Sequence, residues 1–205
     1  MEEIKKIPSR DQIPAEDKWA IEDLYATDEA WEAERTALER SQKTLASFAG
    51  RLGESGETLY AYLETMEQVN ARAELLGNYC MRRADEDTRN AVYQAMAGKF
   101  MGTVVALGAV CSFDTPEIMA ISDEKLAQFY ADCPKLERYR RHLTDLRRRK
   151  AHTLSAAEEK LLASAGEMSQ APDTIYGSLT DADMKFPDAV DAEGNKHPLT
   201  QGTFV

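Results

Sequence analysis

The chain has 205 residues, of which 43% are hydrophobic and 30% are charged, and its formal net charge is −11. This mixture is typical of a globular protein, and the acidic balance argues against broad nucleic-acid binding. The longest apolar run, 100–111, is interrupted by glycine and threonine and is shorter than the roughly 20 residues that cross a bilayer, so we expect no membrane-spanning segment. The N-terminus has no visible secretory signal, and the three widely spaced cysteines are typical of reduced thiols, which together favour a cytoplasmic protein.

The first 26 residues contain two prolines followed by spaced aromatic residues. This pattern predicts an extended arm that packs onto the body of the protein through Trp19, Leu24 and Tyr25. A helix is then expected over 28–49, because Thr27 is a suitable N-cap and acidic residues follow it.

Two longer helices follow the first one. Apolar positions keep helical spacing from Leu59 to Cys80, and a second apolar series runs from Val92 to Cys111. The acidic stretch 85–87 separates the two series, so we expect them to fold back as an antiparallel hairpin. The second of these helices is apolar on most sides near its end, and we expect it to be the most buried.

Shorter elements are expected after residue 112. Ser122 is a suitable cap for a short helix, and Pro134 is expected to open a basic helix. The apolar stripe of the basic helix, which we expect to face inward, consists of Leu136, Tyr139, Leu143 and Leu146.

The C-terminal quarter of the chain changes character. Ser155 and Glu158 form a capping box that starts another helix, and Pro172 is expected to open a further short one. Residues 191–195 predict the turn of a β-hairpin.

Together these patterns predict a mainly α protein with a long antiparallel helical hairpin, shorter helices and a small C-terminal β-hairpin. Two domains are expected. The first, 1–112, holds the N-terminal arm and the helical hairpin, and the second, 113–205, holds the shorter helices and the β-hairpin.

One basic segment stands out in this acidic chain. Eight Lys and Arg residues and two acidic residues give the segment 135–152 a local charge of +6. The four arginines expected on the side away from the apolar stripe are Arg138, Arg141, Arg148 and Arg149. Two interpretations stay open: a solvated face that forms ion pairs with acidic helices, or a docking surface for an acidic partner, a second domain or a peptide carboxylate.

The sequence predicts no catalytic, cofactor-binding or metal-ligating set within the chain. The three histidines, His142, His152 and His197, lack the spacing that places two zinc ligands on one helix face. There is no nucleophile elbow and no glycine-rich phosphate loop. The turn at 191–195 resembles the start of a calcium loop, but Lys196 and Gly202 stand where that loop needs glycine and glutamate.

Four stretches in order carry a resemblance to a known family: KWAIEDLYATDEAWEAE (18–34), SFDTPEIMAI (112–121), LRRRKAHTLSAAEEKLLA (146–163) and LTDADMKFPDAVDAEGNKHPLTQGTF (179–204). Their order and spacing resemble the N-terminal region of oligoendopeptidase F, a zinc metallopeptidase related to the thimet oligopeptidases. The H-T-L-S-x-x-E-E segment and the D-x-x-F…D-x-x-G…L-T-x-G ending carry most of the specificity.

The resemblance implies a cytoplasmic peptidase of mainly α-helical fold that hydrolyses short peptides in an enclosed cavity. In such enzymes an H-E-x-x-H helix and a downstream glutamate hold the zinc. No H-E-x-x-H occurs in these 205 residues, so no catalytic residue is carried over and the zinc ligands are expected outside this chain. The matched residues are expected to be structural: Trp19 and Tyr25 in the arm, His152 with Ser155 and Glu158 at a helix junction, and Gly194 in the hairpin turn.

The leading hypothesis is therefore the non-catalytic N-terminal portion of a zinc-dependent oligoendopeptidase, inactive alone, which walls the cavity and limits substrate size. Its expected partners are the C-terminal catalytic domain and short peptides, with neither nucleic acid nor membrane, and the chain alone is expected to self-associate. The alternative hypothesis is a stand-alone helical adaptor that binds an acidic partner through the basic helix of 135–152.

Overall fold

A computed structural model describes residues 12–87, 90–150, 158, 161–162, 165–177, 179–180 and 184–199. The contacts divide the chain into two compact units, Met1–Ala151 and His152–Val205. Helices from both sides of residue 112 lie in the first unit, and a sequence-domain boundary at that residue stays a prediction. The helix junction predicted at His152 and Ser155 lies outside the described residues.

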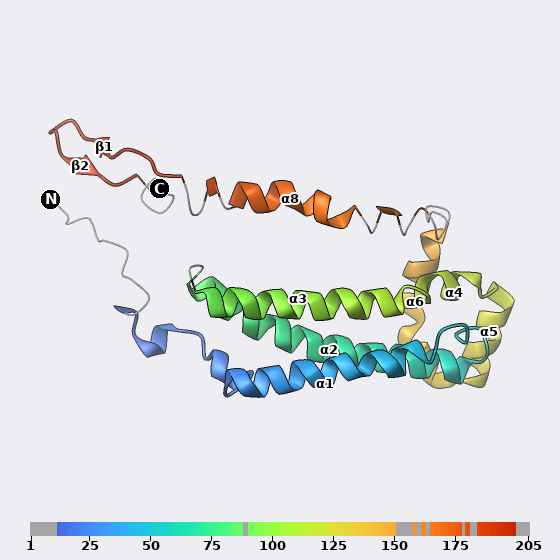
Figure 1. The fold of residues 1–205 in the computed structure, drawn as a ribbon. Coiled ribbons are helices and arrows are strands. Elements are labelled where there is room, and N and C mark those ends of the chain that lie inside the picture. The colour runs from blue at the N-terminus through green and yellow to red at the C-terminus, as the bar shows by residue number, and fades with distance from the viewer. Residues whose placement is uncertain are drawn as a thin grey trace. The chain divides into compact units, whose positions relative to one another are not determined.

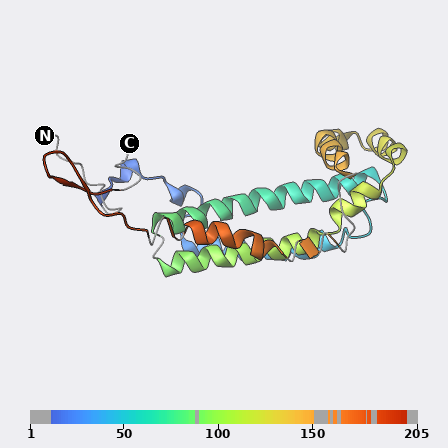
Figure 2. The same cartoon turned by 90° about the horizontal axis from the view of Figure 1, so that it is seen from above.

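Three long helices form the body of the first unit. They are α1 (Asp28–Ala46), α2 (Gly56–Glu86) and α3 (Ala91–Cys111). The three helices lie side by side along their length (Figure 1), and α2 and α3 form the predicted antiparallel hairpin. A second view, from above, shows the same pairing of α2 and α3 (Figure 2).

Each long helix begins where a side chain accepts a hydrogen bond from the first turn. The hydroxyl of Thr27 accepts from the amide of Ala30 at 3.2 Å, as the sequence predicts for α1. Ser55 caps α2 in the same way, and Asn90 caps α3. These bonds satisfy amide groups that have no partner within the helix, which sets the start of each element.

The core between α1 and α2 follows a seven-residue spacing. Trp31, Leu38 and Leu45 are each 1% exposed or less. The indole nitrogen of Trp31 donates to the carbonyl oxygen of Leu76 at 2.9 Å, so the largest core side chain is also satisfied in its polar group. Burial of each such side chain contributes roughly 1.5–3 kcal/mol to folding.

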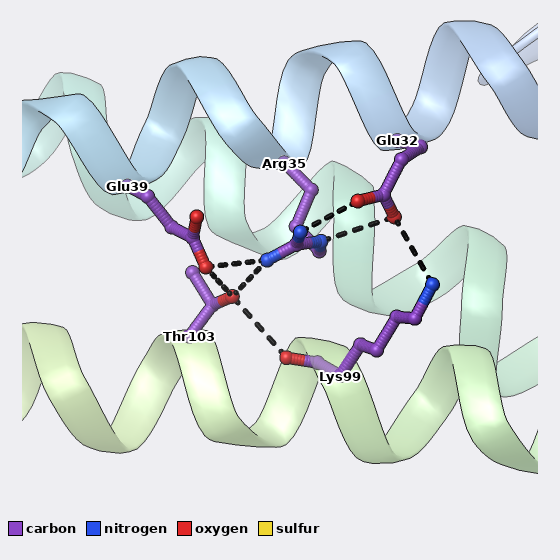
Figure 3. A network of polar contacts seen from close by, with 5 residues as sticks. All are labelled: Glu32, Arg35, Glu39, Lys99 and Thr103. Atoms are coloured by element: carbon purple, nitrogen blue, oxygen red, sulfur yellow. Dashed lines mark hydrogen bonds and ion pairs between the residues drawn. The ribbon is translucent and has the colours of Figure 1, made fainter.

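A polar network joins α1 to α3 (Figure 3). The guanidinium of Arg35 donates to Glu32 at 2.6 Å, to Glu39 at 2.5 Å and to the hydroxyl of Thr103 at 2.9 Å. The ammonium of Lys99 lies 3.9 Å from Glu32. Only 12% of the Arg35 side chain is exposed. The hydrogen bonds to Glu32 raise the pKa of Arg35, which stays charged and fixes the register of the two helices.

Shorter helices gather at the end of the bundle where α2 begins (Figure 1). They are α4 (Asp114–Ala120), α5 (Asp123–Asp132), η4 (Pro134–Tyr139) and α6 (Arg140–Arg148). Ser122 caps α5 as predicted, with its hydroxyl 3.2 Å from the amide of Lys125. The basic segment starts at Pro134 as expected, but its first six residues form the 3-10 helix η4 before α6 begins.

The N-terminal arm contacts the bundle through one of the three residues expected, Tyr25, whereas Trp19 and Leu24 are exposed. Two 3-10 turns precede α1: η2 (Ala15–Asp17) and η3 (Ile21–Asp23). The prediction that Trp19 anchors the arm is wrong, because its side chain is 74% exposed. Ile21 is buried instead, and the ring of Tyr25 packs edge-on against Tyr79 with centroids 5.6 Å apart. The turn of η3 directs Ile21 inward, and no periodicity in the sequence indicates this turn.

The prediction that α3 is the most buried helix is also wrong. Val92 and Val105 are 66% and 67% exposed, because α3 packs on α1 and α2 with one side only. The helix α2 contributes more to the core, since it contacts α1, α3, α5 and η4. The stretch Ala91–Ala120 is long and apolar enough to cross a membrane by length and composition alone. An 18-residue window within it has a mean hydropathy of 1.5, and 28% of that window is buried. The sequence expectation considered only the shorter run 100–111.

The described residues of the second unit include the helix α8 and a hairpin. The helix α8 (Gly166–Gly177) contains Pro172 in its interior, so the prediction that this proline opens a helix is wrong. A proline removes one N–H donor and does not by itself end a helix. The strands β1 (Ala189–Val190) and β2 (Lys196–His197) form the predicted antiparallel hairpin, with Ala189 opposite His197.

The hairpin turn is organised by one carboxylate. Asp191 accepts hydrogen bonds from the amides of Glu193 and Asn195 at 3.0 and 2.7 Å, and its other oxygen lies 2.8 Å from Nε2 of His197. The contact with His197 holds the pKa of Asp191 well below its usual range. Gly194 has φ of 86°, a conformation that favours glycine, which confirms its predicted role in the turn.

Candidate functional site

The candidate site in the first unit is a cleft of about 640 Å³ between α2, the start of α4, and the segment η4–α6. Its walls are largely apolar, with Leu63, Met66 and Ile118 among the lining residues. The polar groups that line it are Tyr62, Glu67, Asn70, Glu74, Asp114, Thr115, Tyr139 and His142. Such a concave site with few polar groups is the usual form of a binding pocket.

One wall is fixed by Tyr62 and Asp114, which link α2 to α4. The buried hydroxyl of Tyr62 donates to Oδ2 of Asp114 at 2.8 Å. Burial, and then the charge of Asp114, raise the pKa of Tyr62, so the phenol remains a neutral donor. The hydroxyl of Thr115 also donates to Asp114, at 3.0 Å. This carboxylate is therefore already occupied by donors of its own wall.

A second carboxylate in the lining, Glu67, links α2 to η4 and accepts from two donors. Glu67 of α2 accepts from the hydroxyl of Tyr139 at 2.6 Å and from the guanidinium of Arg138 at 2.5 Å. Burial, and then the hydrogen bond to Glu67, raise the pKa of Tyr139 to about 12, and the same bond lowers the pKa of Glu67. Since Arg138 and Glu67 are both well exposed, their ion pair contributes little to stability.

The cleft does not fit a zinc ion. His142 is its single histidine, and the part of the chain that the structure describes holds no group of three or more His, Cys, Asp or Glu side chains that could hold a metal. Zinc in proteins needs three or four such ligands around one point. Of the three carboxylates in the lining, Asp114 and Glu67 already accept hydrogen bonds from neighbouring side chains of this chain.

The four predicted docking arginines do not form one cluster around this cleft. Arg138 turns to Glu67, whereas Arg141 is 96% exposed and lies 3.8 Å from Asp145 on its own helix. Arg148 and Arg149 are exposed at the end of α6. A docking role for these arginines stays a prediction.

The basic segment holds a structural residue that the sequence analysis passed over. Arg147 is only 13% exposed, and its guanidinium donates to the carbonyl oxygens of Ile118 and Ile121 at 3.0 and 2.5 Å and to Asp123 at 2.5 Å. It therefore joins α6 to the turn between α4 and α5. The sequence spacing could have indicated this role, because Arg147 follows Leu143 of the apolar stripe by four residues and so lies on the same helix face.

We compared the chain with known proteins, first by structure and then by sequence. The fold resembles that of a putative peptidase from Chlamydophila abortus, with a TM-score of 0.66 and 26% identity over 97% of this chain and 33% of that one. It also resembles oligoendopeptidase-F from Enterococcus faecium, with a TM-score of 0.72 and 28% identity over 87% of this chain and 35% of that one. Both solved structures are named as peptidases, and this chain shares the fold of about a third of each.

The amino-acid sequence matches one family of peptidases. The pattern of the Oligopeptidase F family matches residues 117–186. Oligopeptidase PepF of Bacillus subtilis is 33% identical over the whole of this chain and 31% of its own length. The plasmid oligoendopeptidase F of Lactococcus lactis subsp. cremoris is 34% identical over 96% of this chain and 33% of its own length. The chain matches an N-terminal part of the oligoendopeptidase F proteins and spans about a third of the length of these relatives.

Proposed function

We propose that this chain is the non-catalytic N-terminal portion of a zinc-dependent, cytoplasmic oligoendopeptidase, and that it walls the substrate cavity and limits the size of the peptides that enter. The observation that carries this proposal is the match along the whole chain to peptidases three times as long. The lack of fit to zinc among the described residues supports ligands elsewhere in the protein.

The first test is the mass of the native protein in its source cell, detected with an antibody against this chain. We expect a species about three times heavier than the 22.9 kDa of the 205 residues, because the matched relatives have that length. A native species of 22.9 kDa would contradict the proposal.

The second test uses the isolated chain. We expect it to bind no stoichiometric zinc and to cleave no peptide, measured by metal analysis after dialysis and by a fluorogenic peptide assay with and without chelator. Stoichiometric zinc together with chelator-sensitive cleavage would overturn the non-catalytic role.

The adaptor hypothesis keeps one supporting observation, the exposure of Arg141, Arg148 and Arg149 along α6. Under that hypothesis the double change Arg148→Glu and Arg149→Glu abolishes capture of an acidic partner. Under the peptidase proposal the same change mainly weakens docking to the catalytic domain. A pull-down from the source cell with both versions of the chain distinguishes the two.

A further inference from the structure

The outward side of α3 is largely apolar, although no described residue of the first unit covers it. In its 21 residues the helix has one charged side chain, Lys99, and that ammonium lies beside Glu32 of α1. The core side consists of Met96, Phe100, Thr103, Leu107 and Cys111. An amphipathic surface helix carries mostly polar residues opposite its core side, whereas the exposed polar side chains of α3 are Gln94 and Lys99.

The residues opposite the core side are small and regularly spaced. Those at intervals of three and four are Ala91, Ala95, Gly98, Gly102, Val105 and Ala109, and all six are exposed. With 3.6 residues per turn this spacing aligns them on one side of α3. Glycine lowers helix stability, yet a Cβ at Gly98 or Gly102 would meet nothing within 4 Å. No neighbour in the described chain therefore requires glycine at these positions.

A groove of about 380 Å³ lies beside this side, between α2 and α3. Its apolar lining includes Met81, Phe100 and Met101, and its polar lining includes Glu74 and Arg82. An apolar surface with polar residues around it is the usual anatomy of a protein interface. Small residues allow the backbone of a second helix to approach closely, so a helix fits this surface best.

The length of the relatives indicates which part of the protein can supply such a helix. Each matched relative contains about two thirds of its chain beyond the part equivalent to this one. A membrane is the poorer fit, because the polar contacts of Lys99 and Thr103 with α1 tie the same helix to charged side chains (Figure 3). Charged groups are costly to move into a bilayer.

We propose that the outward side of α3, with the groove beside it, is the docking surface for a helix from the remaining two thirds of the peptidase. This inference rests on the proposed function and adds the surface by which the two parts of the protein join. The apolar side of α3 is then buried in the whole protein, as the hydropathy of the helix requires.

The test enlarges the small residues without disturbing this chain. The variant Gly98→Leu with Gly102→Leu places two large side chains on the outward side of α3. The control, Ala127→Leu with Ala131→Leu, introduces two leucines with the same spacing at exposed positions of α5. Both variants are made in the 205-residue chain and in the longer protein read from its own gene.

In the 205-residue chain we expect the α3 variant to keep or raise the melting temperature, because leucine favours helix and the space is open. In the longer protein we expect the α3 variant to lower the melting temperature by about 5 °C or more and to reduce peptidase activity. The α5 control is expected to change neither.

The other outcomes separate the hypotheses. A gene that encodes no further segment refutes the proposed function and this inference together. A longer protein that the α3 variant leaves unchanged refutes only this inference. The inference also fails if the α3 variant lowers the melting temperature of the 205-residue chain. It fails as well if the unchanged 205-residue chain forms a dimer that the α3 variant abolishes, or if the unchanged chain co-floats with phosphatidylglycerol vesicles. These results would assign the surface to the chain itself, to a second copy or to a membrane.

Discussion

Arg147 and Arg148 are neighbours with the same chemistry, and the fold gives them different roles. Arg147 lies on the inner side of α6 and donates to two backbone carbonyl oxygens between α4 and α5, whereas Arg148 is exposed. A charged donor that satisfies buried carbonyl groups contributes more to stability than an exposed ion pair does.

The substitution Arg147→Met is therefore expected to lower the free energy of unfolding by about 1–3 kcal/mol, because the carbonyl oxygen of Ile121 loses the guanidinium donor and that of Ile118 keeps only the amide of Ile121. The matched substitution Arg148→Met is expected to change it by less than about 0.5 kcal/mol. Urea denaturation followed by circular dichroism measures both. Equal effects of the two substitutions would show that Arg147 does not hold the α4–α5 turn.

At the level of the elements, α2 and α5 approach each other so closely that one position admits only glycine. A Cβ at Gly56, the first residue of α2, would lie 2.6 Å from the carbonyl oxygen of Phe129 and 2.9 Å from Cβ of Cys133. The first of these neighbours is backbone and cannot rotate away, so the two helices would have to separate.

We expect Gly56→Ala to lower the free energy of unfolding by about 1–3 kcal/mol through this clash. Gly53, in the turn before α2, has open space around the same position, and Gly53→Ala is expected to change stability by less than about 1 kcal/mol, with a small gain from reduced unfolded-state entropy. Thermal and urea unfolding of the two variants provide the comparison. A neutral Gly56→Ala would mean that α2 and α5 are further apart than described.

For the molecule as a whole, the buried free cysteines Cys80 and Cys111 couple stability to alkaline pH, because burial raises the pKa of both thiols. Burial raises the pKa of the Cys80 thiol from 9.0 to about 11. Between these values the unfolded chain releases a proton that the folded chain retains. The contribution of the neutral Cys80 thiol to the free energy of unfolding is therefore fully present below pH 9 and is lost as the pH rises through 11.

The native chain is therefore expected to lose about 2 kcal/mol more than Cys80→Ala between pH 8 and 11. Urea denaturation at a series of pH values measures how the free energy of unfolding of each protein changes with pH. Comparing these two slopes removes the constant cost of the cavity that alanine leaves. Parallel slopes for the two proteins would show that the Cys80 thiol does not titrate abnormally.

The local features of the fold were predictable because each depends on residues close together in the chain. Thr27 and Ser122 cap helices through a hydroxyl and an amide three residues away, and Gly194 makes a turn through its own backbone. The seven-residue spacing of Trp31, Leu38 and Leu45 places them on one helix face whatever the helix packs against. The resemblance of the chain to oligoendopeptidase F was also carried by such local stretches.

What the sequence by itself determined is thus the helices, the caps, the β-hairpin and the family. Only the tertiary structure decided which sides of those helices meet. It left Trp19 outside and Ile21 inside, placed Arg147 under the α4–α5 turn, brought Tyr62 to Asp114, and exposed the apolar side of α3. The physical reason is that burial depends on the surfaces that distant segments present to one another, and hydropathy along a single helix does not specify its neighbours.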